Sequence, residues 1–168
     1  MTIAASRPAL LTGLSLTSLV LNGAIFGFFY AWVCSTMWGL DAADPRIAIG
    51  AMQAMNASVR NAVFFPAFFL TGPVLLITAV IAARAGRRAS AQLFAAAGLL
   101  YVLGGTILTM AVNVPMNEAL ALVDVPATLE QARAVWADYS GPWQVFNQIR
   151  TVASGVALGL TGLALLRL

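Results

Sequence analysis

Three clusters of amide and charged side chains interrupt an otherwise apolar sequence, each where the chain enters or leaves a long hydrophobic run. They are Asn56, Arg60 and Asn61; Asn113, Asn117 and Glu118; and Trp143, Asn147 and Arg150. An ionisable group costs about 2.5–3.5 kcal/mol at the centre of a bilayer and less toward its interface, so its presence there indicates a structural or functional role. Asn56 and Arg60 are four residues apart and share a helical face. As a set, these side chains are typical of a polar-lined cavity.

The third cluster is the most regular. Trp143, Asn147 and Arg150 share one face at positions i, i+4 and i+7 of a helix. The same stretch contains Trp136 and Tyr139, and these aromatic residues also suit an interfacial belt that has no role in a site.

The charged residues have purely structural alternatives as well. Arg60 and Arg150 can snorkel toward lipid headgroups, and Glu118 can complement the N-terminus of a helix. Asn147 is harder to explain in this way, because it lies about one turn inside a hydrophobic span and its amide needs partners. Arg60, Asn113 and Glu118 are candidates supplied from the same side.

The elements that position these clusters are membrane-spanning helices. The chain is 61% apolar and only 9% charged, whereas a soluble domain carries about 25% charged residues. Its apolar residues gather into runs that match the roughly 20 residues needed to cross a bilayer. The expected spans of this single domain are about 10–38, 62–83, 90–112 and 143–166. We therefore expect an all-α membrane protein, a four-transmembrane-helix bundle, with the third span ending at Asn113–Pro115.

Short polar helices should cap one end of this bundle. Asp44 before Pro45 is a good N-cap with proline at the first helical position, and Thr128 with Gln131 forms a capping-box pattern. The run 140–142, Ser-Gly-Pro, is expected to end the helix that starts near Thr128, before the fourth span begins. Both N-cap residues lie in the longer connections between spans.

The charges predict an orientation. If both termini and the turn at 84–88 share one side, that side holds Arg7, Arg167 and three more arginines with no acid, while all six acids lie on the other. The positive-inside rule then places both termini in the cytoplasm of a bacterial inner or plasma membrane. The connections 40–61 and 113–142 form an extracytoplasmic cap.

Composition excludes several kinds of site. The nine basic residues are all arginine and form no patch with interleaved aromatics, so nucleic acid is not an expected partner. The chain has no histidine and a single cysteine, Cys34, which we expect to be a packed thiol. We therefore expect no disulfide, no metal site and no protein-ligated cofactor.

Two glycine pairs, Gly23 with Gly27 and Gly155 with Gly159, have the spacing that brings helices close together, within one bundle or in a homo-oligomer.

Four stretches carry a resemblance to a known family. They are residues 23–29, residues 51–61 with AMQAMNASVRN, residues 113–120 with NVPMNEAL, and residues 136–151, which contain W, Y, W, FN and IRT in that order. In these stretches the chain resembles the anthrone-oxygenase-like family of small four-span membrane proteins, much of which is a domain of unknown function. Family members often have histidine beside the asparagine of the last motif, where this chain has Gln148.

The resemblance implies O2-dependent oxidation of a hydrophobic polycyclic aromatic, an anthrone, to an anthraquinone without an evident cofactor. Such an enzyme must bind a flat ring, remove a proton and stabilise negative oxygen. On this hypothesis Glu118 is the base, and Arg60 and Arg150 stabilise the anion. The substrate-binding residues would be Asn56, Asn61, Asn113, Asn117, Asn147 and the stacking residues Trp136 and Trp143.

Two other functions remain open at this point. The chain can be a non-catalytic membrane module that binds a quinone, a lipid or a partner membrane subunit through its polar cap. A channel or transporter is less well supported, because four short spans without an intramembrane acid offer little pathway.

Overall fold

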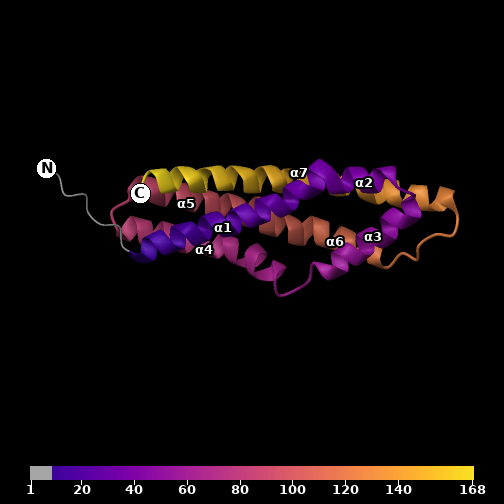
Figure 1. Ribbon diagram of the computed structural model, residues 1–168, viewed down its shortest axis with the longest axis horizontal. Coiled ribbons are helices and arrows are strands. Elements are labelled where there is room, and N and C mark those ends of the chain that lie inside the picture. The colour runs from indigo at the N-terminus through magenta and orange to yellow at the C-terminus, as the bar shows by residue number, and fades with distance from the viewer. Residues whose placement is uncertain (1–8) are drawn as a thin grey trace.

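The computed structural model describes residues 9–168, which are helical apart from short turns and contain no strand (Figure 1). The elements are α1 (Ala9–Ala31), the π-helix η1 (Trp32–Thr36), α2 (Met37–Ala42), α3 (Pro45–Ser58), α4 (Phe64–Arg84), α5 (Arg88–Tyr101), the π-helices η2 (Val102–Ile107) and η3 (Thr109–Asn113), α6 (Val114–Ala121) and α7 (Leu129–Leu166).

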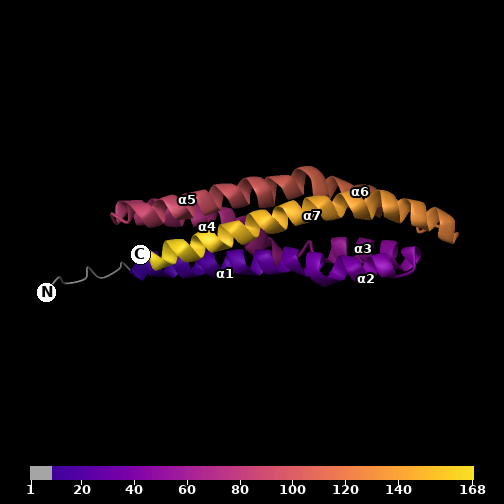
Figure 2. The ribbon, with the colours of Figure 1, turned by 90° about the horizontal axis from the view of Figure 1, so that it is seen from above.

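Four continuous helices are long and apolar enough to cross a membrane, which confirms the predicted fold class. They are Ala9–Ala42, Phe64–Arg84, Arg88–Ala121 and Leu129–Leu166. In the bundle, α1 and α5 each pack against both α4 and α7, so that α1 and α5 occupy opposite corners (Figure 2).

The helices differ in length, and this difference creates the cap. The 21 residues of α4 rise about 30 Å, which matches a hydrocarbon core of roughly 30 Å. The 38 residues of α7 rise roughly 57 Å. Helix α7 therefore extends well beyond the start of α4, and α2, α3 and α6 surround its projecting part.

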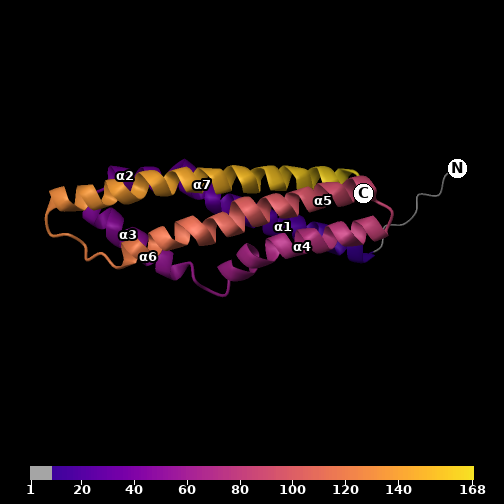
Figure 3. The same ribbon diagram turned by 180° about the vertical axis from the view of Figure 1, so that it is seen from behind.

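The two ends of the bundle carry different charges, as expected. The start of α1, the α4–α5 turn and the C-terminus lie at one end, whereas α2, α3 and α6 lie at the other (Figures 1 and 3). The first end holds Arg84, Arg87, Arg88 and Arg167, and the acids all lie on the capped side. Arg7 is outside the described residues.

The expected break before the fourth span is wrong, because α7 continues through Pro142. Proline is tolerated in membrane helices where surrounding groups hold the chain in place. Here side chains on both sides of the proline are fixed from other elements: Ser140 donates to Asp41 and Trp143 donates to Asn117. Tertiary contacts thus override the local breaker.

The expected end of the third helix at Asn113–Pro115 is also wrong, because the helix runs on to Ala121 through η2 and η3. The Val114 N–H bonds to the carbonyl oxygen of Thr109, five residues earlier, so the π-helical register carries the chain into α6, where Pro115 lies in the first turn. Cys34, expected to be packed, is exposed on η1. The predicted caps at Asp44 and Thr128 are confirmed, because both side chains accept a hydrogen bond from the first turn.

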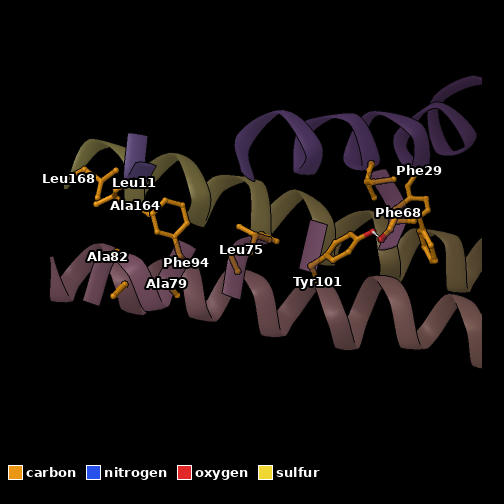
Figure 4. Close-up of a cluster of buried hydrophobic side chains, with 14 residues drawn as sticks. Leu11, Phe29, Phe68, Leu75, Ala79, Ala82, Phe94, Tyr101, Ala164 and Leu168 are labelled. Atoms are coloured by element: carbon orange, nitrogen blue, oxygen red, sulfur yellow. Dashed lines mark hydrogen bonds between the residues drawn. The ribbon is translucent and has the colours of Figure 1, made fainter. Parts of the chain in front are cut away.

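The membrane part of the bundle has a tightly packed core (Figure 4). Leu75 and Phe94 are fully buried there, and the Tyr101 hydroxyl donates to the carbonyl oxygen of Phe68 at 2.8 Å. At Gly104, a Cβ atom would lie 2.6 Å from the Cβ of Ala153, so only glycine allows η2 to approach α7 this closely. This close contact holds η2 against α7.

Candidate functional site

A cavity of about 270 Å³ lies near the N-terminal end of α4. Helix α4 contacts α5 and η2 but neither η3 nor α6, so these elements diverge and leave space between them. The walls are largely aromatic: Phe28, Phe29, Trp32, Phe64, Phe65, Phe68, Phe69 and Trp143. Such a surface suits a flat apolar ligand.

Arg150 provides a buried positive charge in this cavity. Its side chain is 5% exposed, and its guanidinium carbon lies 4.4 Å from the centre of the Phe29 ring and 5.0 Å from that of Trp143. Within residues 9–168, the two arginine–carboxylate pairs join Arg46 to Asp44 and Arg60 to Glu118. The charge of Arg150 is therefore held by hydrogen bonds and aromatic faces without a carboxylate.

Asn147 holds Arg150 in position. Its Oδ1 accepts from Arg150 Nε at 3.0 Å, and its Nδ2 donates to the carbonyl oxygen of Phe29 at 3.3 Å. Arg150 Nη1 also donates to the Thr109 hydroxyl at 3.3 Å. The partners of Asn147 are thus Arg150 and Phe29, rather than the Arg60, Asn113 or Glu118 that the sequence indicated.

Asn117 has an amide orientation set by its neighbours. Its Oδ1 accepts from both the Tyr139 hydroxyl and Trp143 Nε1, each at 2.8 Å. Because an indole N–H can only donate, the oxygen must face Trp143. The NH2 group is the free end of this amide, and Asn117 lines the cavity. Asn56 also lines it and donates to the Tyr139 hydroxyl at 3.4 Å.

A charged pair lies at the capped side of the cavity. Arg60 Nη2 and Glu118 Oε1 are 3.5 Å apart, and the two side chains are 53% and 58% exposed. Both line the cavity with Arg150. The carboxylate therefore has access to solvent, whereas Arg150 does not.

A second side of the cavity is formed by exposed apolar side chains. Phe65, Phe69 and Met110 line the cavity and are between 41% and 48% exposed. All three are apolar and lie in membrane-spanning segments. This side offers an apolar route between α4 and η3.

Four residues that the sequence indicated as substrate-binding lie outside the cavity lining: Asn61, Asn113, Trp136 and Asn147, which holds Arg150 in position. Asn61 caps α4, since its Oδ1 accepts from the amides of Val63 and Phe64. Asn113 is fully buried behind the wall, where its Nδ2 lies 3.5 Å from the carbonyl oxygen of Trp143. Trp136 donates its indole N–H to Asp41. These contacts hold the cap and α4 in place.

Sequence reasoning missed Thr109 and most of the aromatic wall. The run 64–69, with four phenylalanines, signalled only a membrane span, because an apolar residue can face lipid, core or cavity alike. Gln148, which the resemblance singled out, is exposed on α7 and is not among the cavity-lining residues.

Comparison with known proteins identifies one family. The anthrone oxygenase family model matches residues 54–160, which include all the polar residues of the cavity lining. The searches found no match among curated proteins and none among solved structures. Because the matched segment covers most of the chain, this protein belongs to the anthrone oxygenase family.

Proposed function

We propose that the cavity binds a flat, hydrophobic polycyclic aromatic and oxidises it with O2, as in the conversion of an anthrone to an anthraquinone. The observation that carries this proposal is the buried guanidinium of Arg150, which has no carboxylate partner among residues 9–168 and lies near two aromatic rings in a cavity. A ligand oxygen that becomes negative during the reaction would supply the missing charge.

The cavity suits a compact ring system. Its volume of about 270 Å³ is near the lower limit of ligand pockets, which run from roughly 300 to 1,000 Å³. Rings can stack against Trp143, whose orientation is fixed by its hydrogen bond to Asn117. A lipid-soluble substrate enters between α4 and η3, past Phe65 and Met110.

The chemistry follows from two groups in one cavity. Glu118 removes a proton from the ring methylene, and the enolate oxygen that forms is stabilised by Arg150. In an anthrone the methylene and the carbonyl lie on opposite sides of the central ring, so a base and an anion-stabilising group at separate places suit this substrate. Arg60 pairs with Glu118 and holds its carboxylate beside the cavity.

The reaction balances with O2 as the only oxidant. The enolate passes electrons to O2, a carbon–oxygen bond forms at the former methylene carbon, and the resulting hydroperoxide loses water. One oxygen atom becomes the new carbonyl and the other leaves in the water, together with the two hydrogens of the methylene. The proton that Glu118 takes from the methylene returns through solvent to the peroxide oxygen, so that the hydroperoxide forms and Glu118 is again a free carboxylate.

The arginines at one end and the acids at the other support a location in a bacterial plasma membrane, with both termini cytoplasmic and the cap outside. The polar side of the cavity then opens at the outer interface. This location would give the substrate access from the outer leaflet.

The direct test compares variants in membranes that contain the protein. Glu118→Gln and Arg150→Met should each slow anthrone oxidation at least about tenfold, because each removes a charge that acts on the reacting atoms. The exposed residues Glu130 and Arg133 provide matched controls, as Glu130→Gln and Arg133→Met. Wild-type rates in both cavity variants would exclude this mechanism.

A non-catalytic module that binds a quinone or lipid is the second candidate. The lipid-facing side at Phe65, Phe69 and Met110 favours it, because an amphiphile can keep its tail in the bilayer. Purified protein that carries a stoichiometric quinone and consumes no O2 with anthrone would support this candidate and exclude the oxygenase.

A further inference from the structure

Thr109 differs from the other buried threonines in residues 9–168. Four of the five donate their hydroxyl hydrogen to the carbonyl four residues earlier, as is usual for threonine in a helix. These bonds join Thr71 to Ala67, Thr78 to Val74, Thr151 to Asn147 and Thr161 to Ala157. Thr109 makes no such bond, and its one hydrogen bond is as acceptor from Arg150.

The backbone explains this difference. Thr109 is the first residue of η3 and follows closely on η2. In a π-helix the hydrogen-bonding register shifts from four residues to five, so the earlier carbonyl is displaced from the position that a threonine hydroxyl normally reaches. Thr109 is 8% exposed and lines the cavity. Its hydroxyl hydrogen is thus available in a place that solvent scarcely reaches.

The contact with Arg150 gives this hydroxyl a defined role. Because its oxygen accepts from a guanidinium, the O–H bond is polarised and becomes a stronger donor. Guanidinium N–H groups that are not used for Asn147 and Thr109 remain beside it, since arginine has five donors. Two kinds of donor therefore adjoin the same part of the cavity.

We propose that Thr109 and Arg150 form a two-donor clamp for one anionic oxygen, so that the cavity selects aromatic ligands bound as phenolate or enolate. This inference rests on the proposed function in using the same cavity, but it concerns ligand recognition and can be tested without turnover. The remaining charged groups that line the cavity are Arg60 and Glu118, and both stay unchanged in the test.

The probe is a phenanthrol with its hydroxyl on the central ring, a planar tricycle that lacks an oxidisable methylene. Its phenolate absorbs at longer wavelength than the phenol, so the pKa of the bound probe can be read from a pH titration with purified full-length protein. The wild type should lower this pKa below that of the free probe. Thr109→Val should raise it by about one unit, because a hydrogen bond to a charged group is worth roughly tenfold or more.

Two control variants separate the clamp from a packing effect. Thr109→Ser keeps the hydroxyl and should retain the wild-type pKa of the bound probe. Thr71→Val removes a buried hydroxyl that donates to the carbonyl oxygen of Ala67 and does not line the cavity, so it should leave that pKa unchanged. Equal probe pKa values for the wild type and Thr109→Val, or an equal rise in Thr71→Val, would overturn the clamp.

The outcomes also separate this inference from the proposed oxygenase. If the wild type does not oxidise anthrone but binds the phenolate in a Thr109-dependent way, the clamp stands and the oxygenase proposal fails. If the wild type oxidises anthrone and Thr109→Val changes neither the rate nor the probe pKa, the clamp alone fails. With both proposals correct, Thr109→Val should oxidise anthrone about 10- to 100-fold more slowly.

Discussion

Replacing Arg150 with methionine should abolish binding of an anionic ligand while changing the stability of the bundle by no more than about 2 kcal/mol. Arg150 is nearly fully buried and has no carboxylate partner in the described part of the chain. A residue kept for ligand binding is expected to contribute little net stability, whereas a residue kept for packing contributes much.

The magnitude follows from its contacts. Burying the ion costs several kcal/mol. Against this stand two charged hydrogen bonds, to Asn147 and Thr109, worth about 1.5–3 kcal/mol each, and contacts with the Phe29 and Trp143 rings worth about 0.5–2 kcal/mol each. The favourable contributions match the cost of burial in size. Methionine fills much of the same volume without that cost, so we expect a change within about 2 kcal/mol.

The assay is reversible unfolding in mixed micelles, combined with binding of the phenanthrol probe. Phe94→Ala is the reference for a structural residue, since this fully buried ring in the core should cost about 3–5 kcal/mol when truncated. If Arg150→Met destabilised the protein as much as Phe94→Ala, Arg150 would be a structural member of the bundle. The reasoning from its missing partner would then be refuted.

Two further predictions concern the bundle and its cap. Gly104→Ala should destabilise the protein by about 1–3 kcal/mol, because its Cβ would lie 2.6 Å from that of Ala153. Adding Ala153→Gly should restore stability in the same unfolding assay. The control Gly27→Ala, whose Cβ would meet no neighbour within 4 Å, should not destabilise the protein. Hydrogen bonding to Arg46 lowers the pKa of Asp44 to about 2, so the cap of α3 should strengthen folding above about pH 4 and lose this effect as the pH falls through about 2. Protection from hydrogen exchange at the start of α3, measured relative to the intrinsic exchange rate at each pH, should show this loss in the wild type and not in Asp44→Asn. Protection that does not change with pH in the wild type would contradict this prediction.

The four spans and the helix caps could be predicted because they depend on local sequence. The length of an apolar run sets whether a helix can cross a bilayer, and Asp44 followed by Pro45 specifies a helix start whatever surrounds it. The polar clusters could also be found, because an amide or a charge in an apolar stretch needs partners. In the structure, Arg150 donates a hydrogen bond to Asn147, so each of these two buried side chains is a partner of the other.

The rest depends on tertiary contacts that no local pattern encodes. Helix α7 passes through Pro142 because other elements hold its two sides, and π-helical turns extend the third helix beyond Asn113. Whether an amide lines a cavity or supports its wall is decided by small rotations of a helix. Asn61 therefore became a helix cap, while Thr109, an ordinary threonine in the sequence, became part of the cavity.

Incorporation of isotope from heavy-labelled O2 into the product tests the central claim most directly. Purified protein supplied with anthrone and labelled O2 should form anthraquinone that carries one labelled oxygen, at a rate well above that of empty micelles, and Arg150→Met should reduce this excess at least about tenfold. If the protein added nothing to the spontaneous rate, or if its product carried no label, the cavity would not be the site of an oxygenase.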